Sequence, residues 1–231
     1  MKRTIIATAL LAATGAANAG LSFDVLSTYA RTEAFNPTSG FFATQGVGTL
    51  VSVGTLKADA PMELRFTYLG SESGYDNIFY NLYVPGSKLF ENTDSAIHLP
   101  DGYPLGVPGV SSVVGQMTSA GAVDFSFEGD QGRFAYNDRV LHSSWNAMGT
   151  TPGWSNGTSI GLIGTNMVVN GQTYAYVIGY NDSAGQATLG DWDDFVIGVN
   201  PVPEPETYAM LLAGLGLMGF VARRRKQSAT A

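Results

Sequence analysis

Short segments in which apolar and polar residues alternate constrain the fold of this chain most strongly. In the segment Met62–Tyr68, every second residue is apolar or aromatic. Because successive side chains of a β-strand point to opposite faces, this spacing predicts a half-buried strand. Its buried face would carry Met62, Leu64, Phe66 and Tyr68. Comparable segments, bounded by turn residues, predict strands over residues 23–29, 49–55, 78–84, 123–127, 173–180 and 194–199.

The dipeptide Asn170-Gly171 gives the strongest local signal for a hairpin. It separates residues 167–169 from residues 172–174, and both Asn and Gly tolerate the positive φ angles of a two-residue turn. Away from the two ends of the chain, no segment has the pattern of an amphipathic helix longer than a turn or two. We therefore predict an all-β domain, built as an antiparallel β-sandwich of jelly-roll or lectin-like topology.

Length, charge and cysteine content limit what this domain can be. Residues 20–200 suit one domain with one core. Between residues 20 and 202 the chain has 17 acidic and 6 basic residues, a net charge of −11. This acidity and the lack of a basic stripe argue against nucleic acid as a partner. The chain has no cysteine, so an exported form must be stabilised by its apolar core or by bound ions instead of disulfides.

The N-terminus has the parts of a secretory signal peptide. Two cations, Lys2 and Arg3, precede an apolar run, and Ala17 and Ala19 have the small-x-small spacing of a cleavage site. We predict that residues 1–19 are removed on export and form no part of the fold.

The C-terminal tail, residues 201–231, joins three segments in order. It begins with Pro203, Glu204 and Pro205. Because proline lacks a backbone donor and fixes φ, this part is expected to be extended and accessible. An uncharged apolar run follows, which predicts a single transmembrane helix over about residues 207–222. Four membrane-flanking cations end the motif and are expected in the cytoplasm: Arg223, Arg224, Arg225 and Lys226.

This order of segments closely resembles the PEP-CTERM sorting signal of Gram-negative bacteria, over about residues 202–226. The resemblance implies that an exosortase, a membrane-embedded cysteine transpeptidase, recognises Pro203, Glu204 and Pro205 and cuts near them. It also implies an inner-membrane-anchored precursor, whose cargo then reaches the cell surface or the extracellular matrix, typically in bacteria that make exopolysaccharide. The alternative is a plain anchor that is never cut. Residues 207–222 would span roughly 24 Å, less than a hydrocarbon core of about 30 Å, which argues against that alternative.

Acidic residues gather around the last predicted strand. Asn181 and Asp182 follow one predicted strand, Asp191 and Asp193 precede the next, and Asp194 begins it. Closely spaced hard oxygen ligands suit Ca²⁺, and pairing of the two strands would bring both groups together, so calcium is the candidate cofactor. In the other interpretation these side chains cap turns and stay solvated, and strand alternation predicts Asp194 on the solvent face.

Two loop tryptophans, Trp145 and Trp154, are candidates for a platform that binds sugar rings. The alternative is that they cover the ends of the core. No catalytic residue is identified: the match Gly-x-Ser-x-Gly at residues 157–161 lacks the strand–serine–helix context of a nucleophile elbow.

These observations favour an exported, non-catalytic protein of the envelope or of a biofilm matrix, which binds glycan or calcium in an exopolysaccharide context. Two alternatives stay open. One is a secreted hydrolase acting on polysaccharide, and the other is a purely structural matrix protein.

Overall fold

The computed structural model describes residues 20–30, 50–71, 77–83, 88–92, 107–129, 133–138, 140–141, 159–182, 192–203 and 212–220. The chain divides into two compact units, Met1–Pro201 and Val202–Ala231. The division falls at the end of the last strand, where the sorting tail is predicted to begin. The predicted domain boundaries at residues 19 and 200 stay predictions.

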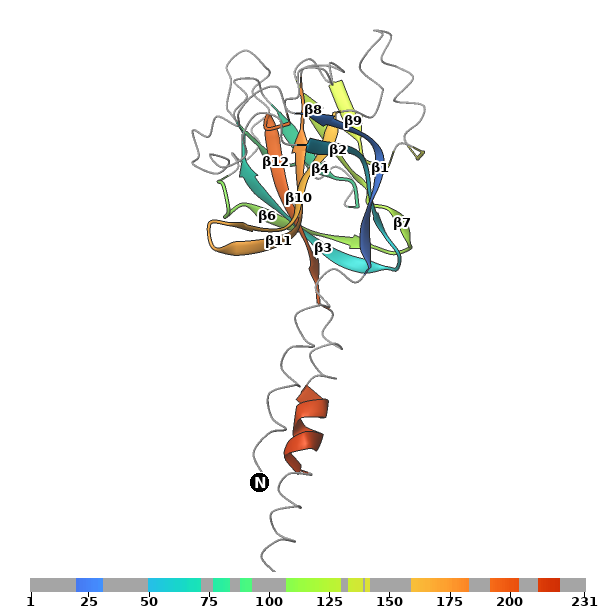
Figure 1. The fold of residues 1–231 in the computed structure, drawn as a ribbon, viewed down its shortest axis with the longest axis vertical. Helices are drawn as coiled ribbons and strands as arrows, with labels where there is room; N and C mark the ends of the chain where they lie inside the picture. Colours follow the sequence, from blue (N-terminus) through green and yellow to red (C-terminus); the bar gives the residue numbers. More distant parts are fainter. Residues whose placement is uncertain are drawn as a thin grey trace, which may run out of the picture. The chain divides into compact units, whose positions relative to one another are not determined.

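The described strands, in chain order, are β1 (Leu21–Ala30), β2 (Leu50–Ala58), β3 (Met62–Gly70), β4 (Ile78–Asn81), β5 (Lys88–Glu91), β6 (Ser112–Met117), β7 (Gly121–Ala122), β8 (Phe125–Gly129), β9 (Arg133–Tyr136), β10 (Ile160–Val169), β11 (Gln172–Tyr180) and β12 (Phe195–Val202). They form an eight-stranded sheet in the order β1-β2-β10-β11-β12-β3-β6, with β7 paired to β2, and a four-stranded sheet in the order β5-β4-β8-β9 (Figure 1). The strand pairs whose register is described are antiparallel. The all-β, antiparallel prediction is confirmed, whereas the jelly-roll or lectin-like type stays a prediction.

Aromatic side chains from both sheets form one core. Phe66 of β3 packs on Phe79 of β4 with ring centroids 5.4 Å apart, and Phe127 of β8 stacks on Tyr180 of β11 at 5.0 Å. These tilted and offset contacts are the arrangements that aromatic pairs prefer. Because both sheets contribute to the same buried cluster, each sheet depends on the other to remove its apolar face from water.

Two local predictions are confirmed within this framework. The predicted apolar face of β3 lies in the core, where Leu64, Phe66 and Tyr68 are buried. At the predicted hairpin, Asn170 and Gly171 have φ angles of 48° and 80°, and the strands β10 and β11 pair directly on either side of them. Gly and Asn occupy such left-handed conformations more readily than other residues, which is why this dipeptide predicts the turn.

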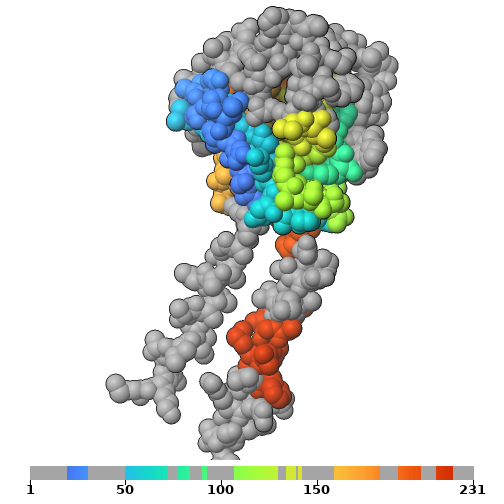
Figure 2. Space-filling model, turned by 90° about the vertical axis from the view of Figure 1, so that its right-hand side faces the viewer, coloured from blue at the N-terminus to red at the C-terminus, as the bar shows by residue number. Residues whose placement is uncertain are grey.

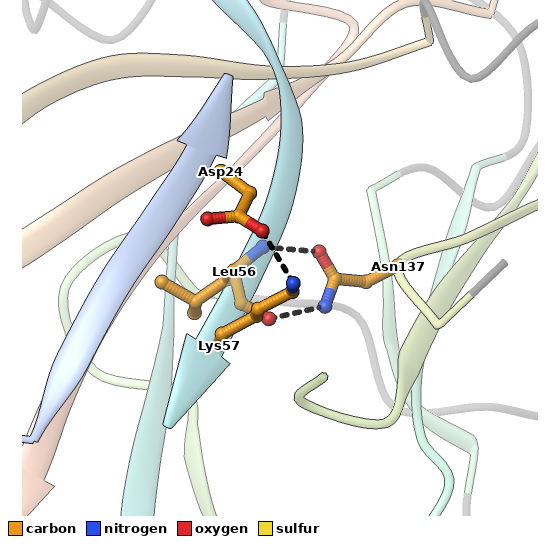
Figure 3. Close-up of polar contacts among 4 residues, drawn as sticks. All are labelled: Asp24, Leu56, Lys57 and Asn137. Atoms are coloured by element: carbon orange, nitrogen blue, oxygen red, sulfur yellow. Dashed lines mark hydrogen bonds and ion pairs between the residues drawn. The ribbon is translucent and has the colours of Figure 1, made fainter. Parts of the chain in front are cut away.

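Strand β1 lies at the edge of the eight-stranded sheet. Figure 2 shows β1 in blue beside β2 in cyan. The register between the two strands shifts between Val25 and Ser27, which makes this part of the edge irregular. Directly before this irregularity, Asp24 of β1 forms an ion pair with Lys57 of β2 (Figure 3). Both side chains are largely exposed, so this pair stabilises the edge only weakly.

Asn137 links the end of β9 to β2, and so connects the two sheets (Figure 3). Its Oδ1 accepts the Leu56 N–H at 2.8 Å, and its Nδ2 donates to the Leu56 carbonyl at 2.9 Å and to the Val123 carbonyl at 2.7 Å. Asn137 is completely buried. One side chain therefore bonds three backbone groups. Two of them belong to Leu56 of β2, so Asn137 supplies the hydrogen bonds that a neighbouring strand would otherwise make there.

Candidate functional sites

The sorting motif begins where the last strand ends. Strand β12 ends at Val202, and Pro203 follows as an exposed residue. Because proline has no backbone N–H to donate to a sheet, it is well placed to end the strand. Glu204 and Pro205 lie outside the described residues, as do the four cations at 223–226. The residues Pro203, Glu204 and Pro205 therefore follow the sheet directly and include no residue of β12.

Part of the predicted membrane helix is described. Residues 212–220 are helical, and their large apolar side chains are exposed, with Leu212 at 68% and Phe220 at 58%. The rest of the span predicted over about 207–222 lies outside the described residues. Within the described ranges, no helix is both long and apolar enough to cross a membrane.

Pairing of β11 with β12 brings two predicted acidic residues together. Tyr180 pairs with Phe195, so Asp182 and Asp194 lie just beyond the same ends of the two strands. The Asp182 N–H donates to Asp194 Oδ2 at 2.7 Å. The prediction that Asp194 faces solvent is wrong, since it is only 5% exposed. The reason is that its carboxylate serves as an acceptor for the neighbouring strand end instead of staying hydrated.

Three residues that the sequence did not single out complete this site. Asn77, which precedes β4, donates from Nδ2 to Asp182 Oδ2 at 2.9 Å and to the Asp194 carbonyl at 3.3 Å. The Asn77 N–H in turn donates to Asn92 Oδ1 at 2.7 Å. Asn92 Nδ2 donates to Ser71 Oγ at 2.7 Å, and the Ser71 hydroxyl donates to the Asp194 carbonyl. We call these five residues the Asp194 network.

The electrostatics of the network follow from burial. Asn77 is completely buried, so its amide can exchange few hydrogen bonds with water. Burial raises the pKa of Tyr68 above its ordinary value, although a hydrogen bond with Ser71 partly opposes that rise. The tyrosine hydroxyl next to the network therefore stays protonated at neutral pH. The two carboxyl groups of the network belong to Asp182 and Asp194.

The described part of the chain holds no group of three or more His, Cys, Asp or Glu side chains placed to hold a metal ion. Of the four predicted ligands, Asp182 and Asp194 lie together, Asp193 is buried, and Asp191 lies outside the described residues. One further oxygen is notable: Asn77 Oδ1 is buried and has no hydrogen-bond partner among the described residues. The network thus offers two carboxylates and one amide oxygen, and calcium binding stays a prediction.

The predicted glycan platform cannot be located, because Trp145 and Trp154 lie outside the described residues. Trp192 is described, and it is a core residue. It is completely buried and packs against Val51 and Val53 of β2. The predicted cleavage residues Ala17 and Ala19 also lie outside the described residues.

Comparison with known proteins bears on the tail alone. Residues 201–226 match the family model of the PEP-CTERM protein-sorting motif. Neither a curated protein nor a solved structure matches the chain. The match confirms the resemblance inferred from the order of proline-rich, apolar and cationic segments. The chain therefore carries a PEP-CTERM sorting motif, which implies that it is exported, begins as a membrane-anchored precursor and is processed by an exosortase.

Proposed function

We propose that the exported domain is a non-catalytic protein of the cell surface or extracellular matrix, which binds glycan or calcium in an exopolysaccharide environment. The observation that carries this proposal is the sorting motif at residues 201–226. A cargo released or attached by an exosortase would function outside the inner membrane. Polysaccharides and divalent cations are the ligands that it would meet there.

The position of the motif supports processing of a folded cargo. Cleavage near Pro203, Glu204 and Pro205 would remove the tail and leave all residues of β12 in the sheet. In the precursor, a helix over about residues 207–222 would anchor the chain in the membrane. The cations at 223–226 would then lie on the cytoplasmic side.

The fold suits a binding module. Two antiparallel sheets share one aromatic core, which favours a β-sandwich of jelly-roll or lectin-like type. Such a scaffold stays rigid while loops and open sheet faces vary in chemistry. The proposed glycan contacts include Trp145 and Trp154, which lie in the sequence between β9 and β10.

Replacement of Pro203, Glu204 and Pro205 by alanine tests the sorting step. We expect the variant to stay in the membrane fraction at precursor size, whereas the unaltered protein appears outside the inner membrane in a shorter form. The control is Pro61→Ala, which changes an exposed proline just before β3 and leaves the whole motif intact. Normal processing of the triple variant would show that these residues are not recognised.

Calcium binding has a specific observation in its favour, because Asp182, Asp194 and Asn77 belong to one network, and Asn77 Oδ1 has no hydrogen-bond partner among the residues that the structure describes. The test is the thermal midpoint of the full chain with calcium and with EDTA. An ion that binds only the folded state at 100 times its Kd adds about 2.7 kcal/mol. We expect calcium to raise the midpoint, and Asp182→Asn to abolish the rise, while Asp24→Asn on exposed β1 keeps it. No shift at millimolar calcium would refute calcium binding.

The two alternatives make different demands. A glycoside hydrolase needs two carboxyl groups about 5–10 Å apart beside a bound sugar. Asp182 and Asp194 lie close together, but each accepts an N–H bond that holds the strand ends. Release of reducing sugars from a polysaccharide, lost in Asp182→Asn, would support the hydrolase. A purely structural protein would show neither ligand binding nor hydrolysis.

A further inference from the structure

The outer face of the four-stranded sheet carries a group of side chains that the sorting function does not use. Alternation along β4 and β8 turns Phe79 and Phe127 into the core, and it turns Tyr80 and Glu128 to the opposite face. The paired strand β9 adds Phe134 opposite Glu128, and Tyr136 opposite Ser126. In Figure 2 the yellow segment that includes β9 lies at the surface beside cyan β2. We call Tyr80, Ser126, Glu128, Phe134 and Tyr136 the β9 face.

Phe134 contacts the two other aromatic rings of the β9 face. The centroid of Phe134 lies 5.7 Å from that of Tyr80 and 5.7 Å from that of Tyr136, and the planes of Phe134 and Tyr136 differ by only 18°. Phe134 is 36% exposed, Tyr136 is half-buried, and Tyr80 is 9% exposed. The accessible part of the group is therefore an apolar surface along β9. Rings of this kind pack against the C–H face of a sugar while their polar neighbours bind its substituents.

A carboxylate is held beside these rings. The Tyr80 hydroxyl donates to Glu128 Oε2, which fixes the carboxylate on the same face. An ionised carboxylate offers about four acceptor positions, so one bond from Tyr80 leaves most of its capacity for a ligand. Glu128 is half-buried, and a hydrogen bond to a partly desolvated charge is stronger than one in open water.

The same face contains a hydroxyl without a partner. Ser126 lies in register between Tyr80 and Tyr136, and it is 1% exposed. Within the part of the chain that the structure describes, Ser126 Oγ has no hydrogen-bond partner. A buried hydroxyl left in this way costs about 1–3 kcal/mol, but at 1% exposure it is out of reach of a ligand on the surface, so the binding surface is formed by the rings and Glu128.

The charge around the face selects the kind of ligand. Burial raises the pKa of Tyr136, and the charges of Glu128 and Asp124 raise it further. The charged side chains that act on Tyr136 are therefore acidic, whereas Lys88 of β5 pairs with Tyr80 on the side of the sheet away from β9. A negative potential beside aromatic rings attracts a cationic ligand and repels an acidic one.

We propose that the β9 face binds a saccharide that carries free amino groups, such as a glucosamine unit. The rings of Phe134 and Tyr136 pack against the apolar face of the sugar, and Glu128 accepts hydrogen bonds from its ammonium group. This inference rests on the proposed glycan-binding function, and it gives that function a surface and a ligand class. Neutral and acidic sugars lack the group that Glu128 recognises.

Isothermal titration of the full chain in detergent micelles tests the proposal. The probes are a glucosamine oligomer, the N-acetylglucosamine oligomer of equal length and a uronic acid oligomer. The titrations are made at a pH below the pKa of the amino groups, so that the glucosamine oligomer is cationic. We expect the glucosamine oligomer to bind about tenfold more tightly than its N-acetylated counterpart, because acetylation removes a charged hydrogen bond. The uronic acid oligomer is expected not to bind.

Two variants assign the binding to the β9 face. Glu128→Gln keeps an acceptor for Tyr80 but removes the charge, and it should weaken glucosamine binding about tenfold. Phe134→Ala removes the exposed ring and should weaken binding about two- to fivefold. The matched controls are Glu63→Gln on β3, which makes the same charge change elsewhere, and Leu50→Ala, which removes an exposed apolar side chain. Both controls should bind like the unaltered protein.

Each other outcome has a separate meaning. If the glucosamine oligomer binds Glu128→Gln as tightly as the unaltered chain, the β9 face is not the site, although the glycan-binding function stands. If none of the oligomers binds, both the inference and that function fail. If a lysine oligomer binds as tightly as the glucosamine oligomer, and Glu128→Gln weakens both, the face recognises cationic protein segments and the saccharide proposal is wrong.

Discussion

The two connections on either side of β11 are held together in different ways. The β10–β11 hairpin is closed by two adjacent residues, Asn170 and Gly171, through their own backbone angles. In the β11–β12 connection, Asp182 is bonded to Asp194, and both are bonded to Asn77. Asn77 lies 105 residues from Asp182 in the sequence and leads into the four-stranded sheet.

The difference shows how the two sheets are coupled. A closure made by adjacent residues depends on local backbone preference and forms whether or not the rest of the domain is folded. A closure made by the Asp194 network exists only when β4 and β12 are both in place. It therefore contributes to cooperative folding of the two sheets, as the buried Asn137 does between β9 and β2. Substitutions in the second connection should accordingly cost more than substitutions in the first.

The largest effect is expected from Trp192→Ala. Trp192 is completely buried within the β11–β12 connection, against Val51 and Val53. Removal of its ring leaves a cavity and should lower the free energy of unfolding by about 4 kcal/mol. Denaturant unfolding of the full chain measures this value. A loss below about 1 kcal/mol would mean that the connection is not anchored through Trp192.

The network itself is tested by Asn77→Ala. This change removes two hydrogen bonds that a completely buried side chain donates, to Asp182 and to the Asp194 carbonyl, so a loss of about 3 kcal/mol is expected. The matched control is Asn200→Ala. Asn200 also bridges two strands, by bonds to the Ala175 N–H and the Thr173 carbonyl, but in a more exposed place. Its loss should be about 1 kcal/mol. Equal losses of unfolding free energy in the two variants would show that the Asp194 network stabilises the domain no more than a local contact between two strands.

The hairpin should tolerate change better. Gly171 has a φ of 80°, and a Cβ added there meets no atom within 4 Å. The cost of Gly171→Ala is therefore conformational alone, about 1 kcal/mol. Gly171→Asn should cost only a few tenths of a kcal/mol, since Asn adopts the left-handed region more readily. Thermal unfolding compares the two variants, and a similar loss in both would point to a steric cause.

The smallest effect concerns alkaline pH. Burial raises the pKa of Tyr68 in the folded state, so the unfolded chain loses this proton first. Stability is fully present below the ordinary pKa of about 10 and decreases as the pH rises above it. Tyr68→Phe should reduce that decrease, and urea unfolding at increasing pH measures the slope. Part of the slope will persist, because burial also raises the pKa of other tyrosines: Tyr83, Tyr136, Tyr174 and Tyr176. An unchanged slope would show that Tyr68 titrates normally.

The strands and turns that could be predicted are those determined by residues that are neighbours in the sequence. Alternation predicted β3 and its buried face, and Asn170-Gly171 predicted the hairpin, because each depends on neighbouring residues. The strand expected over residues 78–84 ends earlier, at Asn81. The Oδ1 atom of Asn81 accepts the Tyr83 N–H, and this bond forms a local turn that competes with continuation of the strand.

The candidate sites divide in the same way. The sorting motif was recognised because its parts follow one another along the chain. The closeness of Asp182 and Asp194 followed from the expected pairing of two strands. The role of Asn77 was not predictable, since the two residues that its side chain bonds, Asp182 and Asp194, are more than a hundred residues away. The β9 face was also missed, because Phe134 and Tyr136 lie on a short strand and Glu128 and Tyr80 come from two others.

The central claim is that the chain is exported and then processed at its tail. Intact mass and terminal sequencing of the protein recovered from producing cells test this claim most directly. We predict a mature chain that begins at Gly20 and ends near Pro203, Glu204 and Pro205, and a longer form that retains the tail in cells without exosortase. Recovery from normal cells of a chain that still ends with Arg223, Arg224, Arg225 and Lys226 would contradict the account and indicate a permanent anchor.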